Sequence, residues 1–294
     1  MMRRKSFRLK LPSRTLLLGP RTLVMGVLNI TPDSFSDGGK FLDPTSAIEH
    51  ALVMERAGAD LLDIGGESTR PGSFGTPAEQ ELARILRVLK GLRGVLKIPI
   101  SIDTQKLGVA EAALDAGAEI INDISGLKSD ARLAELAARR RVPLILMHMR
   151  GEPRTMQKSG FARDVIKDVT HGLKSSLAIA RKAGVAKSQI ILDPGIGFGK
   201  SFAQNYELLE KLPLLAKLGY PLLVGTSRKG FLGATLAREG KHAPPEDRIW
   251  GTAATVTASI LNGVHIVRVH DVSEMVQVAR VADCVASPRL RRSL

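Results

Sequence analysis

The 294 residues carry a formal net charge of +14 at neutral pH, and 44% of them are hydrophobic, which suffices for one large core. No apolar run approaches the roughly 18 residues of a membrane span, and a single cysteine, Cys284, excludes a disulfide framework or a thiolate metal cluster and is typical of a reducing cytoplasm. Because the charge is scattered and aromatic residues make up only 4% of the chain, we expect an anionic small-molecule substrate, with no specific nucleic-acid partner and no membrane.

The two ends of the chain differ from its middle in composition. Residues 1–20 combine basic residues with a short leucine run, but they lack an apolar signal region and a small-residue cleavage site. We therefore predict an N-terminal arm over residues 1–20 and a basic C-terminal tail over residues 286–294. No linker interrupts residues 21–285, so these residues are predicted to form one domain.

Eight short apolar runs rich in β-branched residues are spaced along this domain, and we predict a strand at each. They lie near residues 23–28, 61–64, 98–102, 119–122, 143–147, 189–192, 221–224 and 264–267. Near-continuous apolar strands of this kind are typical of a parallel sheet that is buried on both faces.

Amphipathic helices are predicted between the strands. Asp43 followed by Pro44 favours a helix start, and Thr76-Pro77 with Glu79 has the pattern of a capping box. After the second start, apolar residues recur at the i, i+3, i+4, i+7 spacing of a helix that packs on a sheet: Leu82, Ile85, Leu86 and Leu89. Eight alternating units predict an α/β protein, a single (β/α)8 TIM barrel of ordinary length.

A weak internal repeat precedes three of the strands. Each copy has a glycine where a helix is expected to end in a positive-φ conformation, at Gly58, Gly117 and Gly263. Five residues later each copy has a polar residue near the carboxyl end of the strand: Asp63, Asn122 and Arg268. That end of a parallel barrel carries the active site. For Asp63 we expect only a structural role, hydrogen-bonding the backbone of the following loop.

Polar sequences follow nearly every predicted strand. In chain order they are LNITPDSFSDGG, DIGGESTRPG, SIDT, INDISG, LMHMRG, DPGIGFGK, GTSRKGF and RVHD. Charged residues placed directly after buried strands are costly to desolvate unless something binds there. Their recurrence predicts one shared polar pocket at the carboxyl end of the barrel.

VMGVLNITPDSFSDGG, DIGGESTRPG, DPGIGFGK, TSRKGF and RVHDV resemble the signature sequences of dihydropteroate synthases, in the order found in that family, over residues 24–272. The resemblance implies a pterin-binding transferase of folate biosynthesis. Such an enzyme condenses a dihydropterin methyl diphosphate with p-aminobenzoate, giving dihydropteroate and diphosphate. It also implies Mg²⁺ as cofactor and a homodimer, to which the apolar stretch 250–261 would contribute. Sulfonamides and other p-aminobenzoate mimics would compete for the second substrate's slot.

The resemblance assigns pterin recognition to residues at several strand ends. Asp193 would accept two hydrogen bonds from the amino and ring N–H groups of the pterin. Asp103 and Asn122 would bind other ring positions, and Lys229 would donate to the carbonyl side. Asp123, next to Asn122, is left as an alternative partner for the same contacts.

Arg268 and His270 alternate on the last strand, so both can face the same side and donate to the diphosphate. By resemblance Asn29 binds Mg²⁺, which is otherwise held by substrate phosphates and water. His148 and His265 are interpreted as structural. Diphosphate is a good leaving group and the pterin can delocalise positive charge, so a loose, SN1-like displacement is favoured. The amine of p-aminobenzoate is neutral at pH 7, so no strong general base is required.

Loops after the first two strands are expected to complete the site. By resemblance they close over the diphosphate and shape the p-aminobenzoate slot, which would involve Thr31, Pro32, Phe35, Ser68, Arg70, Pro71 and Ser227. Thr69 would contact the pterin. Arg70 would pair with Asp33 or the diphosphate. Arg70 and Asp33 are therefore expected to be catalytic, together with Lys229 and Asp103. Some relatives have Ser at the position of Gly230, so the contact to the benzoate carboxylate there is open.

Two other classes of protein remain as alternatives. A corrinoid-linked methyltransferase with the same barrel should lack the TPDSFSDGG and STRPG sequences, and this chain has both. A non-catalytic paralogue that only binds pterin or nucleic acid should have lost Asp193, Lys229 or Arg268, and all three are present.

Overall fold

Eight parallel strands form one sheet, in the order β8-β7-β6-β5-β4-β3-β10-β9. The structure, a computed structural model, describes residues 4–31, 43–68, 72–152, 154–156, 160–287 and 290. A parallel bridge between Leu192 and Leu222 joins the two edge strands and closes the sheet into a barrel. The strands are β3 (Leu23–Asn29), β4 (Leu61–Gly65), β5 (Ile100–Asp103), β6 (Ile120–Asp123), β7 (Leu144–Met147), β8 (Ile190–Asp193), β9 (Leu223–Val224) and β10 (Ile266–Val269). All eight predicted strands and the barrel are confirmed.

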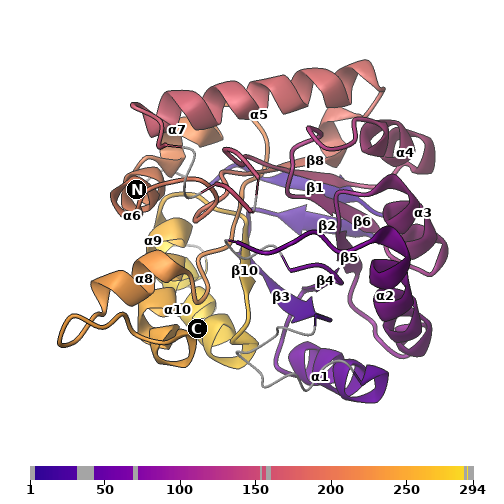
Figure 1. Cartoon of the computed structure of the whole chain (residues 1–294), viewed down its shortest axis with the longest axis horizontal. Coiled ribbons are helices and arrows are strands. Elements are labelled where there is room, and N and C mark those ends of the chain that lie inside the picture. Colours follow the sequence, from indigo (N-terminus) through magenta and orange to yellow (C-terminus); the bar gives the residue numbers. More distant parts are fainter. Residues whose placement is uncertain are drawn as a thin grey trace.

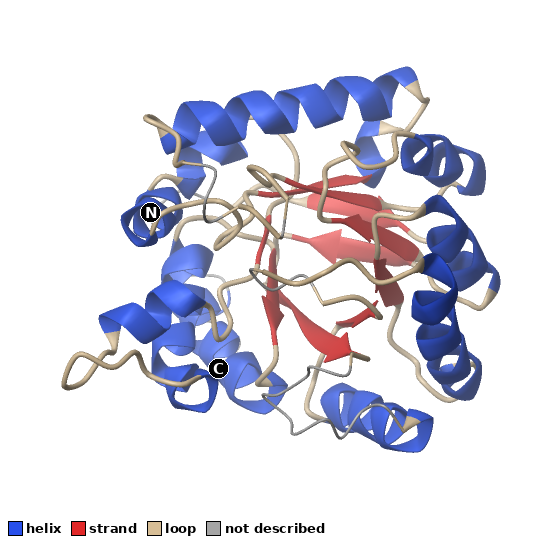
Figure 2. Cartoon of the chain, in the orientation of Figure 1, coloured by secondary structure: helices blue, strands red, loops and turns tan. Residues whose placement is uncertain are grey.

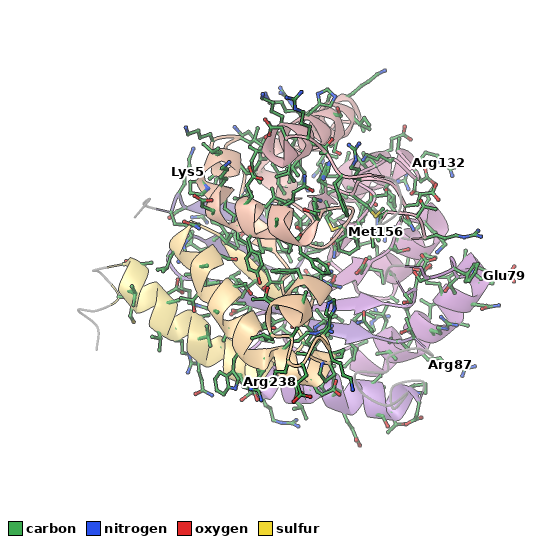
Figure 3. The ribbon with its side chains drawn as sticks, turned by 60° about the vertical axis from the view of Figure 1, so that its left-hand side comes forward. Lys5, Glu79, Arg87, Arg132, Met156 and Arg238 are labelled. Carbon is green, nitrogen blue, oxygen red and sulfur yellow. The ribbon has the colours of Figure 1, made fainter. Side chains whose placement is uncertain are left out.

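Helices surround the strands, as Figures 1 and 2 show. Figure 3 shows three of their charged residues, Glu79, Arg87 and Arg132, projecting into solvent. Among the described residues, no helix is long and apolar enough to cross a membrane. The α-helices are α1 (Pro44–Arg56), α2 (Ala78–Leu92), α3 (Leu107–Asp115), α4 (Arg132–Arg140), α5 (Val165–Lys182), α6 (Phe202–Glu210), α7 (Leu212–Ala216), α8 (Gly230–Thr235), α9 (Ile249–Leu261) and α10 (Val272–Ala286). Short 3-10 helices η3 (Lys187–Gln189) and η4 (Pro245–Arg248) precede β8 and α9.

Local signals set most helix boundaries. The Asp43 carboxylate caps α1 by accepting the Ser46 N–H, as predicted. The predicted glycine ends are also confirmed, with φ of +98° at Gly58, +110° at Gly117 and +91° at Gly263. These signals therefore mark the start of α1 and the ends of α1, α3 and α9.

The capping box predicted at Thr76 is wrong. Helix α2 begins at Ala78, and its N-cap residue, Pro77, makes no side-chain capping bond. The Thr76 N–H, which Glu79 was to bind, donates instead to Glu67 Oε1 at 2.7 Å. A carboxylate nine residues away has thus replaced the local cap and ties the end of the β4–α2 loop to its beginning.

The N-terminal arm contains a hairpin that the sequence analysis did not anticipate. Strands β1 (Phe7–Lys10) and β2 (Thr15–Leu18) pair antiparallel. Leu9, Leu11 and Leu18 are buried, and they pack against residues from the amino-terminal halves of the barrel strands, among them Leu61 and Ile266. The hairpin therefore plugs the end of the barrel opposite to the carboxyl ends of the strands.

Leu18→Ala should lower the free energy of unfolding by about 2–5 kcal/mol, because it leaves a cavity in the plug. Leu18 is fully buried, whereas its neighbour Leu17 is 53% exposed. Urea denaturation measures both variants, and Leu17→Ala should change the free energy of unfolding by no more than about 0.5 kcal/mol. Equal effects for the two substitutions would contradict the plug.

Candidate active site

The five charged or amide residues predicted to meet at the strand ends line one cavity. Its polar residues come from β5, β6, β8, the segment before α8, and β10; they are Asp103, Asn122, Asp193, Lys229 and Arg268. Apolar walls come from Ile124, Met147, Ile196 and Phe198. The predicted convergence is confirmed, and the cavity combines apolar walls with hydrogen-bonding side chains.

Asp193 is the last residue of β8 and presents a buried carboxylate to the cavity. One oxygen, Oδ1, accepts the Gly195 N–H at 2.7 Å. The other oxygen has no hydrogen-bond partner within the described part of the chain. Burial raises the pKa of Asp193 to about 6, although the Gly195 N–H and the charges of Lys200 and Lys229 act to lower it.

Arg268 joins two of the acidic strand ends. Its Nε donates to Asp63 Oδ2 at 2.6 Å, and its Nη2 donates to Asp103 Oδ2 at 2.8 Å. Asn122 Nδ2 also donates to Asp63 Oδ2, at 3.0 Å. Burial raises the pKa of Asp103 to about 7 against the opposing effect of Arg268.

The loop-capping role expected for Asp63 is therefore wrong. Asp63 is fully buried, and its carboxylate binds the side chains of Arg268 and Asn122 rather than loop backbone. Asp63 does not line the cavity itself, but it supports two of the residues that do.

Lys229 stands at the N-cap of α8 with its side chain in the cavity. Its Nζ lies 4.1 Å from the centroid of the Phe198 ring. Burial and the nearby Arg268 lower the pKa of Lys229 to about 8. No carboxylate pairs with Lys229 among the described residues, so its ammonium group can donate to a ligand.

A strained residue holds the segment that carries Lys229. Arg228 has φ of +59°, a conformation that costs energy for a residue with a side chain. Its guanidinium group binds Asp271 through Nε at 3.1 Å and Nη2 at 2.5 Å, and its N–H donates to Thr252 Oγ1. These contacts fix the backbone immediately before Lys229.

Asp123, the alternative partner for the contacts of Asn122, binds backbone groups of its own turn. Its two carboxylate oxygens accept the N–H groups of Ser125 at 2.8 Å and Leu127 at 2.6 Å. Asp123 thus stabilises the turn after β6. Asn122, one position earlier on the strand, faces the cavity.

The other predicted residues that the structure describes do not line the cavity. His270 donates its backbone N–H to Ser227 Oγ at 3.1 Å, and its ring Nδ1 lies 3.0 Å from the same oxygen. Asn29 ends β3 opposite Gly65 of β4, and Thr31 is buried just beyond it. Ser68 is half-buried after β4. Pro32, Asp33, Phe35, Thr69, Arg70 and Pro71 lie outside the described residues.

The interpretation of His265 as structural is confirmed. Its Nδ1 accepts the Leu222 N–H at 3.1 Å, and its ring packs edge-on against Phe7 of the hairpin, 5.2 Å between centroids. Burial lowers its pKa to about 4. His265 therefore belongs to the closed end of the barrel.

Sequence analysis missed the apolar walls and one buried cation. Phe198 and Ile196 alternate with glycines in DPGIGFGK, a pattern that signals a loop but not the direction of its side chains. Lys200, at the end of the same sequence, is only 2% exposed. Its sequence position after a glycine-rich loop gave no indication of burial.

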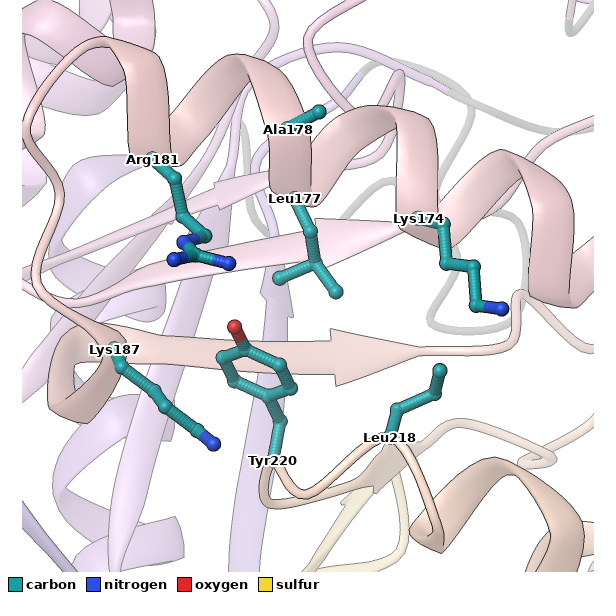
Figure 4. Close-up of a pocket in the computed structure, with 7 residues that line it drawn as sticks. All are labelled: Lys174, Leu177, Ala178, Arg181, Lys187, Leu218 and Tyr220. Atoms are coloured by element: carbon teal, nitrogen blue, oxygen red, sulfur yellow. The ribbon is translucent and has the colours of Figure 1, made fainter.

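A second hollow, of about 440 Å³, lies on the outside of the barrel between α5 and the segment before β9. Figure 4 shows Arg181 and Leu177 pointing from α5 toward Tyr220, with Lys187 beside the ring. It contains none of the strand-end polar residues and opens on the outer surface. We therefore place the candidate active site in the smaller cavity at the carboxyl ends of the strands.

Comparison with known proteins identifies the family of this chain. Residues 25–270 match the family described as pterin binding enzyme. A dihydropteroate synthase from Synechocystis sp. is 48% identical over 91% of this chain and 91% of its own length. A structure of the Xanthomonas albilineans dihydropteroate synthase with 4-aminobenzoic acid is 41% identical with a TM-score of 0.87, over 96% of this chain and 99% of that one. A dihydropteroate synthase from Clostridium difficile, solved in the presence of pteroic acid, is 44% identical with a TM-score of 0.83, over 91% and 98%.

With the barrel, the converging strand ends and these matches over nine-tenths of its length, the chain belongs to the dihydropteroate synthase family of pterin-binding enzymes, transferases of folate synthesis.

Proposed function

We propose that this protein condenses (7,8-dihydropterin-6-yl)methyl diphosphate with p-aminobenzoate to give 7,8-dihydropteroate and diphosphate. The observation that carries the proposal is the free carboxylate oxygen of Asp193 in a cavity that also presents Asn122, Asp103 and Lys229. The names of the related structures support the two halves of the product, since one was solved with 4-aminobenzoic acid and another with pteroic acid.

The proposed pterin pose follows from the donors and acceptors of the cavity. A pterin presents an amino group and a ring N–H side by side, and Asp193 can accept both in a charge-assisted pair. Asn122 and Asp103 would bind other ring positions, and Lys229 would donate to the ring carbonyl. Phe198, Ile124 and Met147 offer apolar surface for the faces of a flat bicyclic ring.

The diphosphate is proposed to extend from the cavity toward Arg268 and His270. Arg268 is held by Asp63 and Asp103, so its guanidinium group is fixed before substrate binds. Preorganised cations near the leaving group lower the barrier because they need no rearrangement as negative charge develops. The bond between the methylene carbon and the diphosphate oxygen would break early, in an SN1-like displacement, and the neutral amine of p-aminobenzoate would then attack.

Magnesium is proposed as the cofactor, with Asn29 as its protein ligand. The Asn29 Oδ1 lies beside Gly65, 3.7 Å from the position a Cβ would take there, and the Asp103 side chain lies on the same side of that glycine. A neutral oxygen suits Mg²⁺, which takes its remaining ligands from phosphates and water. When bound, the ion would offset the charge of the departing diphosphate.

The p-aminobenzoate slot is proposed to be formed by residues of the first two loops and of the segment before α8: Thr31, Pro32, Phe35, Ser68, Arg70, Pro71 and Ser227. Thr69 would contact the pterin. Asp33 would pair with Arg70. At Gly230, the first residue of α8, a Cβ would meet no atom within 4 Å. The benzoate carboxylate can therefore approach the N–H groups at the start of α8. We further propose a cytoplasmic homodimer, with Trp250, 79% exposed on α9, as a contact residue.

The function is tested by incubating the protein with pterin diphosphate, Mg²⁺ and p-aminobenzoate and measuring diphosphate release. A synthase releases diphosphate only when all three are present. Tight pterin binding without p-aminobenzoate-dependent release would identify a non-catalytic pterin-binding protein instead.

Lys229→Ala should lower kcat/KM by about 100-fold or more, because it removes a charge-assisted hydrogen bond of roughly 3 kcal/mol. The Lys229 ammonium lies over Phe198 and has no structural ion pair among the described residues, so thermal stability should change little. Steady-state kinetics and a melting curve measure the two effects. Lys211→Ala on the surface, which removes the exposed pair with Glu207, is the matched control. Near-normal turnover in Lys229→Ala would remove Lys229 from the site.

A further inference from the structure

Lys200 is a buried lysine that lies behind the active site rather than in it. It follows the glycine-rich segment after β8, is 2% exposed and does not line the cavity. No carboxylate lies within ion-pair distance of its Nζ in the described parts of the chain. Burial lowers the pKa of Lys200 to about 7, so compensating hydrogen bonds are needed to keep its ammonium form.

Three acceptors surround the Lys200 ammonium group. They are His148 Nδ1 at 3.0 Å, the His148 carbonyl oxygen at 2.9 Å and the Gly195 carbonyl oxygen at 2.8 Å. An ammonium group has three protons, so all of them are bound. Because His148 follows β7 and Gly195 follows β8, Lys200 joins the ends of two neighbouring strands.

His148 is held in one form by the same contacts. Burial and the charge of Lys200 lower its pKa to about 2, so the ring is neutral. The ammonium form of Lys200 can only donate to Nδ1, which places the ring proton on Nε2, 3.6 Å from Asp168 Oδ2. Asp168 is in turn paired with Arg150 at 2.9 Å. The neutral ring therefore offers Nδ1 as an acceptor to the Lys200 ammonium group.

Lys200 binds Gly195, the residue that orients the Asp193 carboxylate. The Gly195 N–H donates to Asp193 Oδ1 at 2.7 Å, and the Gly195 carbonyl accepts both Lys200 Nζ and the Phe198 N–H, the latter at 3.1 Å. Gly195 has φ of +69°, and a Cβ there would lie 1.9 Å from the His148 carbonyl oxygen. The turn at Gly195 is thus packed tightly against His148, and the hydrogen bond from Lys200 holds it there.

We propose that Lys200 is a positioning residue for pterin recognition, which fixes the Gly195 turn and through it the Asp193 carboxylate and the Phe198 ring beneath Lys229. The inference rests on the proposed role of Asp193. The positive charge of Lys200 also favours the ionised form of Asp193, since it lowers the pKa of that carboxyl group.

Lys200→Met tests the proposal, because methionine keeps most of the apolar stem and removes the ammonium group. The KM for the pterin diphosphate should rise by about 10- to 100-fold, and the KM for p-aminobenzoate should stay within about 2-fold. The pH below which pterin binding is lost should move upward, because Asp193 would be protonated more readily. Lys128→Met is the matched control, since Lys128 Nζ donates to the carbonyl of Met149, next to His148, but makes no contact with Gly195.

A second pair of variants covers the case in which Lys200→Met does not fold. His148→Asn keeps an acceptor near the Nδ1 position, and His148→Leu removes it. Pterin affinity should be nearly normal in the first and about 10-fold weaker in the second. Equal affinities in the two, or a Lys200→Met protein with normal pterin KM and pH profile and only a lower Tm, would overturn the inference. Wild-type protein that binds no pterin would overturn the proposed function as well.

Discussion

Asp193→Asn is expected to weaken pterin binding by about 100-fold or more and to reduce turnover to background, because two charge-assisted hydrogen bonds of at least roughly 1.5 kcal/mol each are lost. The asparagine Oδ1 can still accept the Gly195 N–H that Asp193 binds at 2.7 Å. Its amide Nδ2 would then face the cavity and present a donor to the donors of the pterin. The substitution should therefore weaken pterin binding without lowering the stability of the fold.

Calorimetric pterin titration and a melting curve together check this result. Asp283→Asn is the control, since Asp283 is another buried aspartate, which accepts the Thr22 N–H at 2.6 Å in the closed end of the barrel. It should lower Tm and leave pterin affinity unchanged. If Asp193→Asn bound pterin normally, the carboxylate would have no part in recognition.

The pH dependence of the same interaction has a defined sign. Burial raises the pKa of Asp193 from its ordinary value of 3.8 to about 6, so pterin affinity should decline as pH falls through about 6. In Asp193→Asn this part of the acid limb should vanish. Burial also raises the pKa of Asp103, to about 7. Asp103 is present in both the wild-type protein and Asp193→Asn, so its contribution to the acid limb should remain in the variant. An acid limb that is identical in the two would assign the dependence to Asp103.

Arg268→Met is expected to remove turnover and to lower the free energy of unfolding by about 3–5 kcal/mol, because it leaves buried carboxylates without their cation. Asp63 is fully buried, and Arg268 Nε, which binds its carboxylate at 2.6 Å, is its partner cation. Asp103, 2.8 Å from Nη2, loses its partner as well. Urea denaturation and the diphosphate-release assay measure stability and activity separately.

The double variant Asp63→Asn/Arg268→Met separates the two consequences. It removes the unpaired charge together with its partner, so much of the lost stability should return, as a coupled pair requires. Turnover should not return, because the diphosphate still lacks the guanidinium group. Arg4→Met is the control, since Arg4 is a buried arginine paired with Asp283 far from the cavity. Arg4→Met should lower the free energy of unfolding and leave turnover unchanged. Recovery of turnover in Asp63→Asn/Arg268→Met would exclude Arg268 from catalysis.

Local sequence signals were sufficient for the barrel because its elements follow from short-range physics. The apolar runs had the length of buried strands, and glycines such as Gly58 and Gly117 marked helix ends that need positive φ. Parallel strands put their carboxyl ends at one edge, so the order of polar sequences along the chain predicted that Asp103, Asn122 and Asp193 would meet. Two local expectations failed, the capping box at Thr76 and the role of Asp63, in both cases because a residue distant in sequence supplied the partner.

The sequence by itself thus determined which elements form, in which direction they run and which side chains reach the functional end of the barrel. Tertiary structure alone decided the pairings: the hairpin that plugs the opposite end, the ion pairs of Arg268 with Asp63 and Asp103, and the burial of Lys200 beneath Gly195. The physical reason is the distance along the chain over which each interaction acts. Helix ends and strand patterns depend on neighbours within a few residues, whereas a buried charge selects its partner by distance in space. Asp63 and Arg268 are 205 positions apart in the sequence, so no local pattern predicts that they form an ion pair.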